Sequence, residues 1–109
     1  MNGFGDYIAA ARKKLGLSQK DLASRIIKED GTPISLQYLN DIEHGRRNPP
    51  PAYLIQQLAA QLHLSEGYLS ILARQLPQEL LELEPDRLQP DAVEAGIKAF
   101  RRALENKRG

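Results

Sequence analysis

The stretch LSQKDL at residues 17–22 contains the pattern from which the fold can be predicted. A serine that can cap a helix follows one apolar residue, and a second apolar residue stands five positions after the first, as in a hydrophobic staple around an N-cap. The same arrangement returns as ISLQYL at residues 34–39 and as LSEGYL at residues 64–69. We therefore expect three helices to begin at these serines, and we predict an all-α protein.

Apolar residues at helical spacing predict further helices around these three. Residues 5–16 form one such segment, residues 53–62 form a second after three successive prolines, and a last helix is expected from about Asp91. Prolines interrupt the chain between the fifth helix and the last one. We predict a bundle domain over residues 1–76 and a C-terminal helical extension over residues 77–109.

The segment after the second start predicts a helix followed by an unusual turn. Leu22, Ala23 and Ile26 are expected to point inward, and Ile27 is a further candidate for the core. Residues 28–33 are polar and contain Gly and Pro, which is typical of a surface turn.

Composition and length indicate one ordinary globular domain. The chain has 109 residues, of which 41% are hydrophobic and 27% charged, and it contains no cysteine that could form a disulfide. Residues 1–11 do not read as a signal peptide, and no stretch approaches the roughly 20 apolar residues needed to span a bilayer. We therefore expect a cytoplasmic protein without a membrane partner.

The charge of the chain is unevenly distributed. The formal net charge is only +1, which is low for a protein that binds nucleic acid. Residues 79–94 hold six acidic residues against one arginine, and the rest of the chain has 14 basic residues against 8 acidic ones. The overall balance therefore hides a basic remainder.

The third helix separates into two faces. Leu39 and Ile42 point inward, whereas the outward face carries Gln37, Asn40, Asp41 and His44. Glutamine and asparagine can each bond both the N6 donor and the N7 acceptor of adenine in the major groove. Taken alone, such a face also fits a helix that is simply solvated.

Two segments, one before the third helix and one within and after it, favour the base-reading interpretation over a simply solvated helix face. The stretches LGLSQKDLA at residues 15–23 and YLNDIEHGRRNP at residues 38–49 resemble the Cro/cI-type, or xenobiotic-response-element type, helix-turn-helix family. The resemblance extends over residues 4–75. It implies a five-helix, phage-repressor-like bundle whose second and third helices bind double-stranded DNA, commonly as a homodimer on a near-palindromic operator.

The resemblance also implies roles for individual residues. Positions that read bases in the family are occupied here by Leu36, Gln37, Asn40 and Asp41. Positions that contact the DNA backbone are occupied by Ser18, Gln19, Lys20, Tyr38, Arg46, Arg47 and Asn48. The turn between the two helices is several residues longer than is usual in the family. Leu36 stands where many relatives carry a polar residue, which suggests contact with a thymine methyl group.

Glu43 lies at the inner edge of the third helix. A half-buried carboxylate requires a cationic partner, and we expect Arg12 of the first helix to provide it. Members of the family commonly show such a pair, and we interpret it as structural rather than catalytic.

No constellation of residues indicates an enzyme. His44 and His63 lie far apart in sequence without the spacing of metal ligands, and the glycines do not form a phosphate-binding loop. The acidic pairs of residues 79–94 lie in a segment broken by prolines, where solvated charge is the simpler interpretation. We therefore expect no catalysis, no metal and no cofactor.

The C-terminal helix carries an apolar stripe at 4-3-4 spacing, formed by Val93, Ile97, Phe100 and Leu104. A helix this short needs a surface to pack against, which is either a second copy of the chain or its own core. Two functions follow. The chain is either a repressor that acts as a homodimer, or an antitoxin-like or anti-activator module whose C-terminal segment binds another protein and whose DNA binding is autoregulatory.

Overall fold

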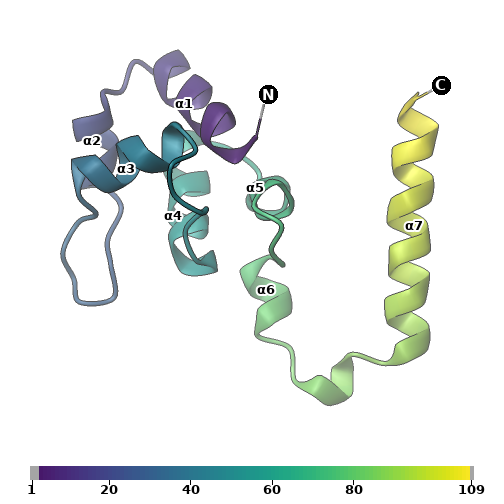
Figure 1. Cartoon of the computed structure of the whole chain (residues 1–109). Coiled ribbons are helices and arrows are strands. Elements are labelled where there is room, and N and C mark those ends of the chain that lie inside the picture. Colours follow the sequence, from purple (N-terminus) through teal and green to yellow (C-terminus); the bar gives the residue numbers. More distant parts are fainter. Residues whose placement is uncertain (1–2, 109) are drawn as a thin grey trace.

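The computed structural model describes residues 3–108, and all the regular elements in that part of the chain are helices (Figure 1). The all-α prediction is therefore confirmed. In chain order the helices are α1 (Phe4–Lys14), α2 (Gln19–Ser24), α3 (Leu36–Glu43), α4 (Ala52–Leu62), α5 (Glu66–Leu72), α6 (Gln78–Leu81), the 3-10 turn η1 (Pro85–Arg87) and α7 (Pro90–Arg108).

The three predicted helix starts are present. Each of the three serine hydroxyls accepts a hydrogen bond from the backbone amide three residues later, at 2.9, 3.0 and 3.1 Å for Ser18, Ser35 and Ser65. Asp21 also accepts a hydrogen bond from the Ser18 amide, which completes a capping box at the start of α2. These bonds satisfy amides that the first turn of a helix leaves without a partner.

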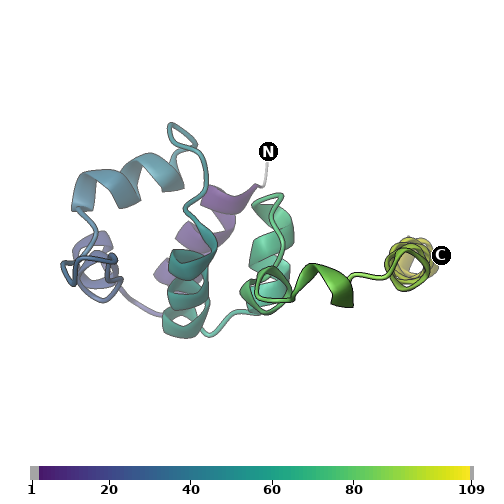
Figure 2. The same cartoon turned by 90° about the horizontal axis from the view of Figure 1, so that it is seen from below.

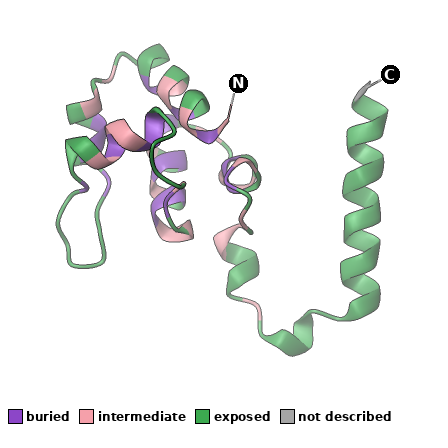
Figure 3. Cartoon of the chain, viewed as in Figure 1, coloured by how far each residue is buried: buried purple, intermediate pink, exposed green. Residues whose placement is uncertain are grey.

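The core is enclosed by the five helices α1 to α5. Each of these five helices has at least one fully buried aliphatic side chain, and examples are Ile8, Leu22, Leu39, Ile55 and Leu69. Figure 3 shows the buried residues gathered in this part of the chain. Burying an aliphatic side chain of this size stabilises the fold by about 1.5–3 kcal/mol. The packing of these five helices on one another therefore fixes the position of α3.

A close backbone contact joins α1 to the end of α3. A Cβ atom added at Gly5 would lie 2.3 Å from the carbonyl oxygen of Ile42 and 2.7 Å from that of Glu43. No side chain fits at such distances, so glycine is required in the first turn of α1. The contact sets how closely α1 approaches α3.

The long turn between α2 and α3 is a loop whose two ends are held together by hydrogen bonds. The Ile34 amide donates to the Ile26 carbonyl at 2.9 Å, and Ile27 and Pro33 form an isolated antiparallel bridge. The side chain of Gln57 in α4 accepts from the Ile27 amide at 2.7 Å and donates to the Ile27 carbonyl at 2.8 Å. Because the bridge turns it outward, the Ile27 side chain is 36% exposed, and its suggested place in the core was wrong.

The C-terminal segment lies apart from the bundle. The short helix α6 contacts α4, but in α7 all the side chains described are exposed. The stripe of Val93, Ile97, Phe100 and Leu104 is between 41% and 55% exposed. In Figures 1 and 2, α7 stands at the end of the molecule opposite α2 and α3. Among the residues described, none of the helices is long and apolar enough to cross a membrane.

Candidate nucleic-acid interface

The first turn of α3 presents two of the proposed base-reading side chains to solvent. Leu36 is 49% exposed, and Gln37 beside it is also exposed. On the opposite face of the helix, Leu39 and Ile42 are buried in the core. The helix is thus held from behind while its outer face remains free.

The other two proposed base-reading residues are half-buried and hydrogen-bonded to neighbours. Asp41 accepts from Nε2 of Gln37 at 2.9 Å and from Nε of Arg46 at 3.1 Å. Asn40 accepts through Oδ1 from the guanidinium of Arg46 and donates through Nδ2 to Gln19. Arg46 therefore binds both residues, and it links the loop after α3 to the helix itself.

The hydrogen bond from Gln37 is the main reason that the pKa of Asp41 is lowered, and Arg46 and Arg47 lower it further. Partial burial acts in the opposite direction. The carboxylate is thus held in its charged form at neutral pH, as a fixed acceptor on the outer face of α3.

Behind this face, Arg12 and Glu43 form a buried ion pair with two hydrogen bonds. Nε of Arg12 lies 2.8 Å from Oε2 of Glu43, and the second guanidinium nitrogen lies 2.9 Å from Oε1. Arg12 also donates to the carbonyl of Leu17 at 2.9 Å. The hydrogen bond to Glu43 is the largest contribution that raises the pKa of Arg12. The pair joins α1, α3 and the chain segment before α2.

Gln19, the first residue of α2, connects the buried pair to the outer face. Its Nε2 donates to Oε1 of Glu43 at 2.9 Å, and its Oε1 accepts from Asn40 at 3.1 Å. Because Glu43 can only accept, it fixes which end of the Gln19 amide faces Asn40. An unbroken chain of hydrogen bonds therefore runs from Arg12 to Arg46. Sequence reasoning missed this link, since contacts between two separate helices leave no signal in residue spacing.

The remaining residues predicted to contact the DNA backbone lie around the two helices. Ser18 caps α2 through its hydroxyl, and Lys20 and Asn48 are exposed. The guanidinium of Arg47 lies 5.3 Å from the centre of the Tyr38 ring, which is a cation–π distance. Partial burial raises the pKa of Tyr38. The structure thus places these residues on α2, on α3 and in the loop that follows α3.

A hollow of about 410 Å³ at the start of α3 combines basic and aromatic residues. Lys28 of the long turn and Arg47 both line it, together with the rings of Tyr38 and Tyr53. We call it the basic hollow. Tyr53 begins the helical segment predicted over residues 53–62, and it was not among the predicted site residues. Its position two residues after the last of the three prolines was the available signal.

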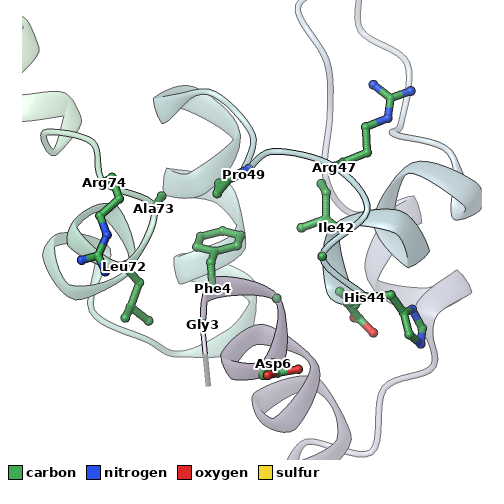
Figure 4. Close-up of a pocket in the computed structure, with 13 residues that line it drawn as sticks. Gly3, Phe4, Asp6, Ile42, His44, Arg47, Pro49, Leu72, Ala73 and Arg74 are labelled. Atoms are coloured by element: carbon green, nitrogen blue, oxygen red, sulfur yellow. The ribbon is translucent and has the colours of Figure 1, made fainter. Parts of the chain in front are cut away.

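A second hollow, of about 420 Å³, lies where the start of α1 meets the ends of α3 and α5. Figure 4 shows the Phe4 ring in it, close to Pro49. The ionisable side chains of Asp6, His44 and Arg47 extend away from that ring rather than toward one another. Within residues 3–108, no group of three potential metal ligands converges.

Comparisons with known proteins agree with this geometry. A family model described as helix-turn-helix (HTH_3) matches residues 8–69, which include both α2 and α3. No curated protein matches the chain. Among solved structures, a chain of a SinR protein/SinI protein complex is similar, with a TM-score of 0.51 and 25% identity. The alignment covers 96% of the present chain and 94% of that chain, so it includes the C-terminal segment.

Proposed function

The chain belongs to the HTH_3 helix-turn-helix family and is a DNA-binding transcriptional regulator, and we propose that it represses transcription as a homodimer on a near-palindromic operator. The observation that carries the proposal is the outer face of α3. Leu36 and Gln37 are exposed there, while Leu39 and Ile42 anchor the helix to the core. A helix held in this way can enter the major groove without losing its own packing.

Base reading is assigned to four residues of α3, whose side chains differ in how freely they can reach a base. Gln37 is suited to bond an adenine edge, and Leu36 is suited to contact a thymine methyl group. Asn40 and Asp41 are half-buried and are each hydrogen-bonded to two neighbouring side chains, whereas Gln37 is exposed and its side chain holds one hydrogen bond, to Asp41. We therefore expect Leu36 and Gln37 to contribute more to sequence discrimination than Asn40 and Asp41.

Backbone contacts are assigned to the residues that surround α3. Lys20 and Asn48 are exposed, and Arg47 lines the basic hollow together with Lys28. A hollow with cationic groups and aromatic rings at the start of a helix suits a phosphate group. The other proposed backbone contacts are Ser18, Gln19, Tyr38 and Arg46.

Dimerisation is proposed because one helix-turn-helix reads few base pairs. Two copies double the contacts and set the half-sites about one helical turn of DNA apart. The apolar stripe of α7 is exposed and lies at the end of the molecule opposite α3. A contact through α7 therefore leaves both copies of α3 uncovered. Repression follows from occupying the promoter, so it requires no ligand-binding domain.

The test begins with selection of bound DNA from a random pool, which yields the preferred site. Gln37→Ala should then weaken binding to that site by about 1–3 kcal/mol and leave binding to random DNA almost unchanged. Gln56→Ala, which removes an exposed glutamine from α4, is the matched control. An equal loss on both kinds of DNA would remove Gln37 from the base-reading residues.

The backbone assignment is tested by salt dependence. Arg47→Ala should weaken binding to all sequences alike and reduce the slope of log affinity against log salt by about one. Arg87→Ala removes the same charge from η1, far along the chain from α3, and should leave the slope nearly unchanged. A change of sequence preference with Arg47→Ala at constant slope would contradict the assignment.

A second candidate function is supported by the similar structure. The SinR chain was solved in complex with the SinI protein, and the alignment extends over the C-terminal segment of the present chain. An antitoxin-like or anti-activator module would use that segment to bind another protein. Sedimentation of the purified chain separates the two candidates, since a stable homodimer favours the repressor and a monomer favours the protein-binding module.

A further inference from the structure

The apolar stripe of α7 has the spacing and the exposure of a surface that packs against a second helix. Its four members follow 4-3-4 spacing over 12 residues, and each is at least 41% exposed. A seam with this spacing packs against a second helix that carries a matching seam. No other described part of the chain covers it, because all the side chains described in α7 are exposed.

Charge is distributed unequally along α7. Its first turns contain Asp91 and Glu94 and no basic residue. From Lys98 onward the helix contains five basic residues and one acidic residue. The helix therefore has an acidic beginning and a basic end, so two copies attract each other only when they run in opposite directions.

We propose that the stripe of α7 packs against the same stripe of a second copy of the chain, with the two helices antiparallel and Glu94 beside the partner's Arg101. This inference rests on the proposed homodimer and adds its interface and orientation. Opposite directions place Val93 against the partner's Leu104, and Ile97 against the partner's Phe100, so small and large side chains alternate along the seam.

The residues that flank the seam fit this orientation. Glu94 and Arg101 lie seven residues apart, which is about two helical turns, so they lie on the same edge of the helix. In the antiparallel pair this edge faces the same edge of the partner helix. The twofold symmetry of the pair therefore produces two Glu94–Arg101 contacts. The other edge places Gly96 near the partner's Ala103, and a Cβ at Gly96 would meet nothing within 4 Å in its own chain. Two small residues there allow the helices to approach closely.

A parallel pair lacks these contacts. It brings the basic end of one helix beside the basic end of the other, where like charges repel. Each charged edge then faces the small residues Gly96 and Ala103, so Glu94 and Arg101 find no opposite charge. The helix therefore favours the antiparallel arrangement.

Disulfide trapping in the full-length protein tests the orientation, since the chain has no cysteine of its own. Val93→Cys and Leu104→Cys chains are prepared separately, mixed and oxidised. Antiparallel helices should cross-link the mixture and neither variant alone, because two Val93 positions would lie about 16 Å apart and disulfides need Cα atoms within about 7 Å. Circular dichroism and thermal unfolding of each variant establish that it is folded.

Charge reversal tests the proposed contacts without a cross-link. Glu94→Arg and Arg101→Glu should each raise the dimer dissociation constant roughly tenfold, because two attractive contacts become repulsive. The double variant should restore dimerisation. Double variants that remain as weak as the singles would overturn the Glu94–Arg101 pairing.

The outcomes separate the inference from the function on which it rests. Cross-linking of Val93→Cys with itself would show a parallel pair, and a dimer that no cysteine traps would place the interface elsewhere. Each of these results overturns the inference and leaves the dimeric repressor standing. A chain that sediments as a monomer, with α7 binding a different protein, would overturn both.

Discussion

The five-helix bundle and α7 contain the same kinds of residues in the same helical spacing, yet they differ in what their apolar faces contact. Leu39 in α3 is fully buried, whereas Leu104 in α7 is 55% exposed. In the bundle each apolar face meets another face of the same chain. In α7 the face is formed but its partner is missing from the described chain.

This difference separates two sources of stability. The bundle folds by contacts within one molecule, so its stability does not depend on protein concentration. A single helix such as α7 is marginal in water and gains stability from packing against something else. If a second copy provides that surface, the stability of α7 rises with concentration. The two regions should therefore respond differently to the same kind of change.

The largest effect is expected from breaking the ion pair in the bundle. Arg12→Ala leaves Glu43 buried with Gln19 as its remaining side-chain donor, so the free energy of unfolding should fall by about 3–5 kcal/mol. Urea unfolding followed by circular dichroism measures it. Replacing both partners, as in Arg12→Met with Glu43→Leu, should lose much less. Equal losses in the two variants would show that the cost comes from losing the ion pair itself and not from leaving Glu43 buried without its cation.

Deleting residues 90–109 should affect association and spare the bundle. Without α7 we expect a folded monomer with an unchanged unfolding midpoint. Its affinity for the operator should fall at least about a hundredfold, while weak nonspecific binding persists. Sedimentation and operator titration measure the two properties. A truncated chain that still sediments as a dimer would move the interface into α1–α5.

A smaller effect is expected at the start of α3. Ser35→Ala removes the acceptor that caps this helix, and the free energy of unfolding should fall by about 1 kcal/mol. Ser24→Ala serves as the control, because Ser24 lies at the end of α2 and its hydroxyl donates to the Asp21 carbonyl. A loss at Ser24 as large as that at Ser35 would show that the cap has no special role.

The smallest effect is expected from acid. Hydrogen bonds from the Ser18 amide and hydroxyl lower the pKa of Asp21 in the folded state. A carboxylate with a lowered pKa stabilises the fold above the usual pKa of about 4, and this contribution disappears as the pH falls through the lowered value. Thermal unfolding between neutral and acid pH should show a shallower decline for Asp21→Asn. The same decline in both proteins would contradict this role.

Much of the bundle could be predicted because its signals are local. A serine cap and two apolar residues five positions apart lie within six residues, so LSQKDL, ISLQYL and LSEGYL each locate a helix start. The resemblance to a known family added the interpretation of α2 and α3. The pairing of Arg12 with Glu43 followed from the need of a buried carboxylate for a cation.

The rest depends on contacts between distant segments, and spacing within one segment does not encode them. The place of the Gln19 amide between Glu43 and Asn40 was not predicted, because it joins two helices that are separate in sequence. Ile27 looked apolar enough for the core, but Gln57 holds its backbone at the surface. The isolation of α7 was left open, because an apolar stripe does not identify its partner.

The two hydrogen bonds between the Gln57 side chain and the Ile27 backbone make the orientation of α3 independent of the length of the loop before it. Residues 28–33 begin and end at a base that is fastened by the Ile26–Ile34 hydrogen bond and by α4. Glu29 and Gly31 at the tip are exposed and support no packing. Insertions or peptide tags at the tip should therefore leave the orientation of α3 within the bundle unchanged. In evolution, such a loop can change in sequence and length and gain new contacts while the position of α3 stays the same.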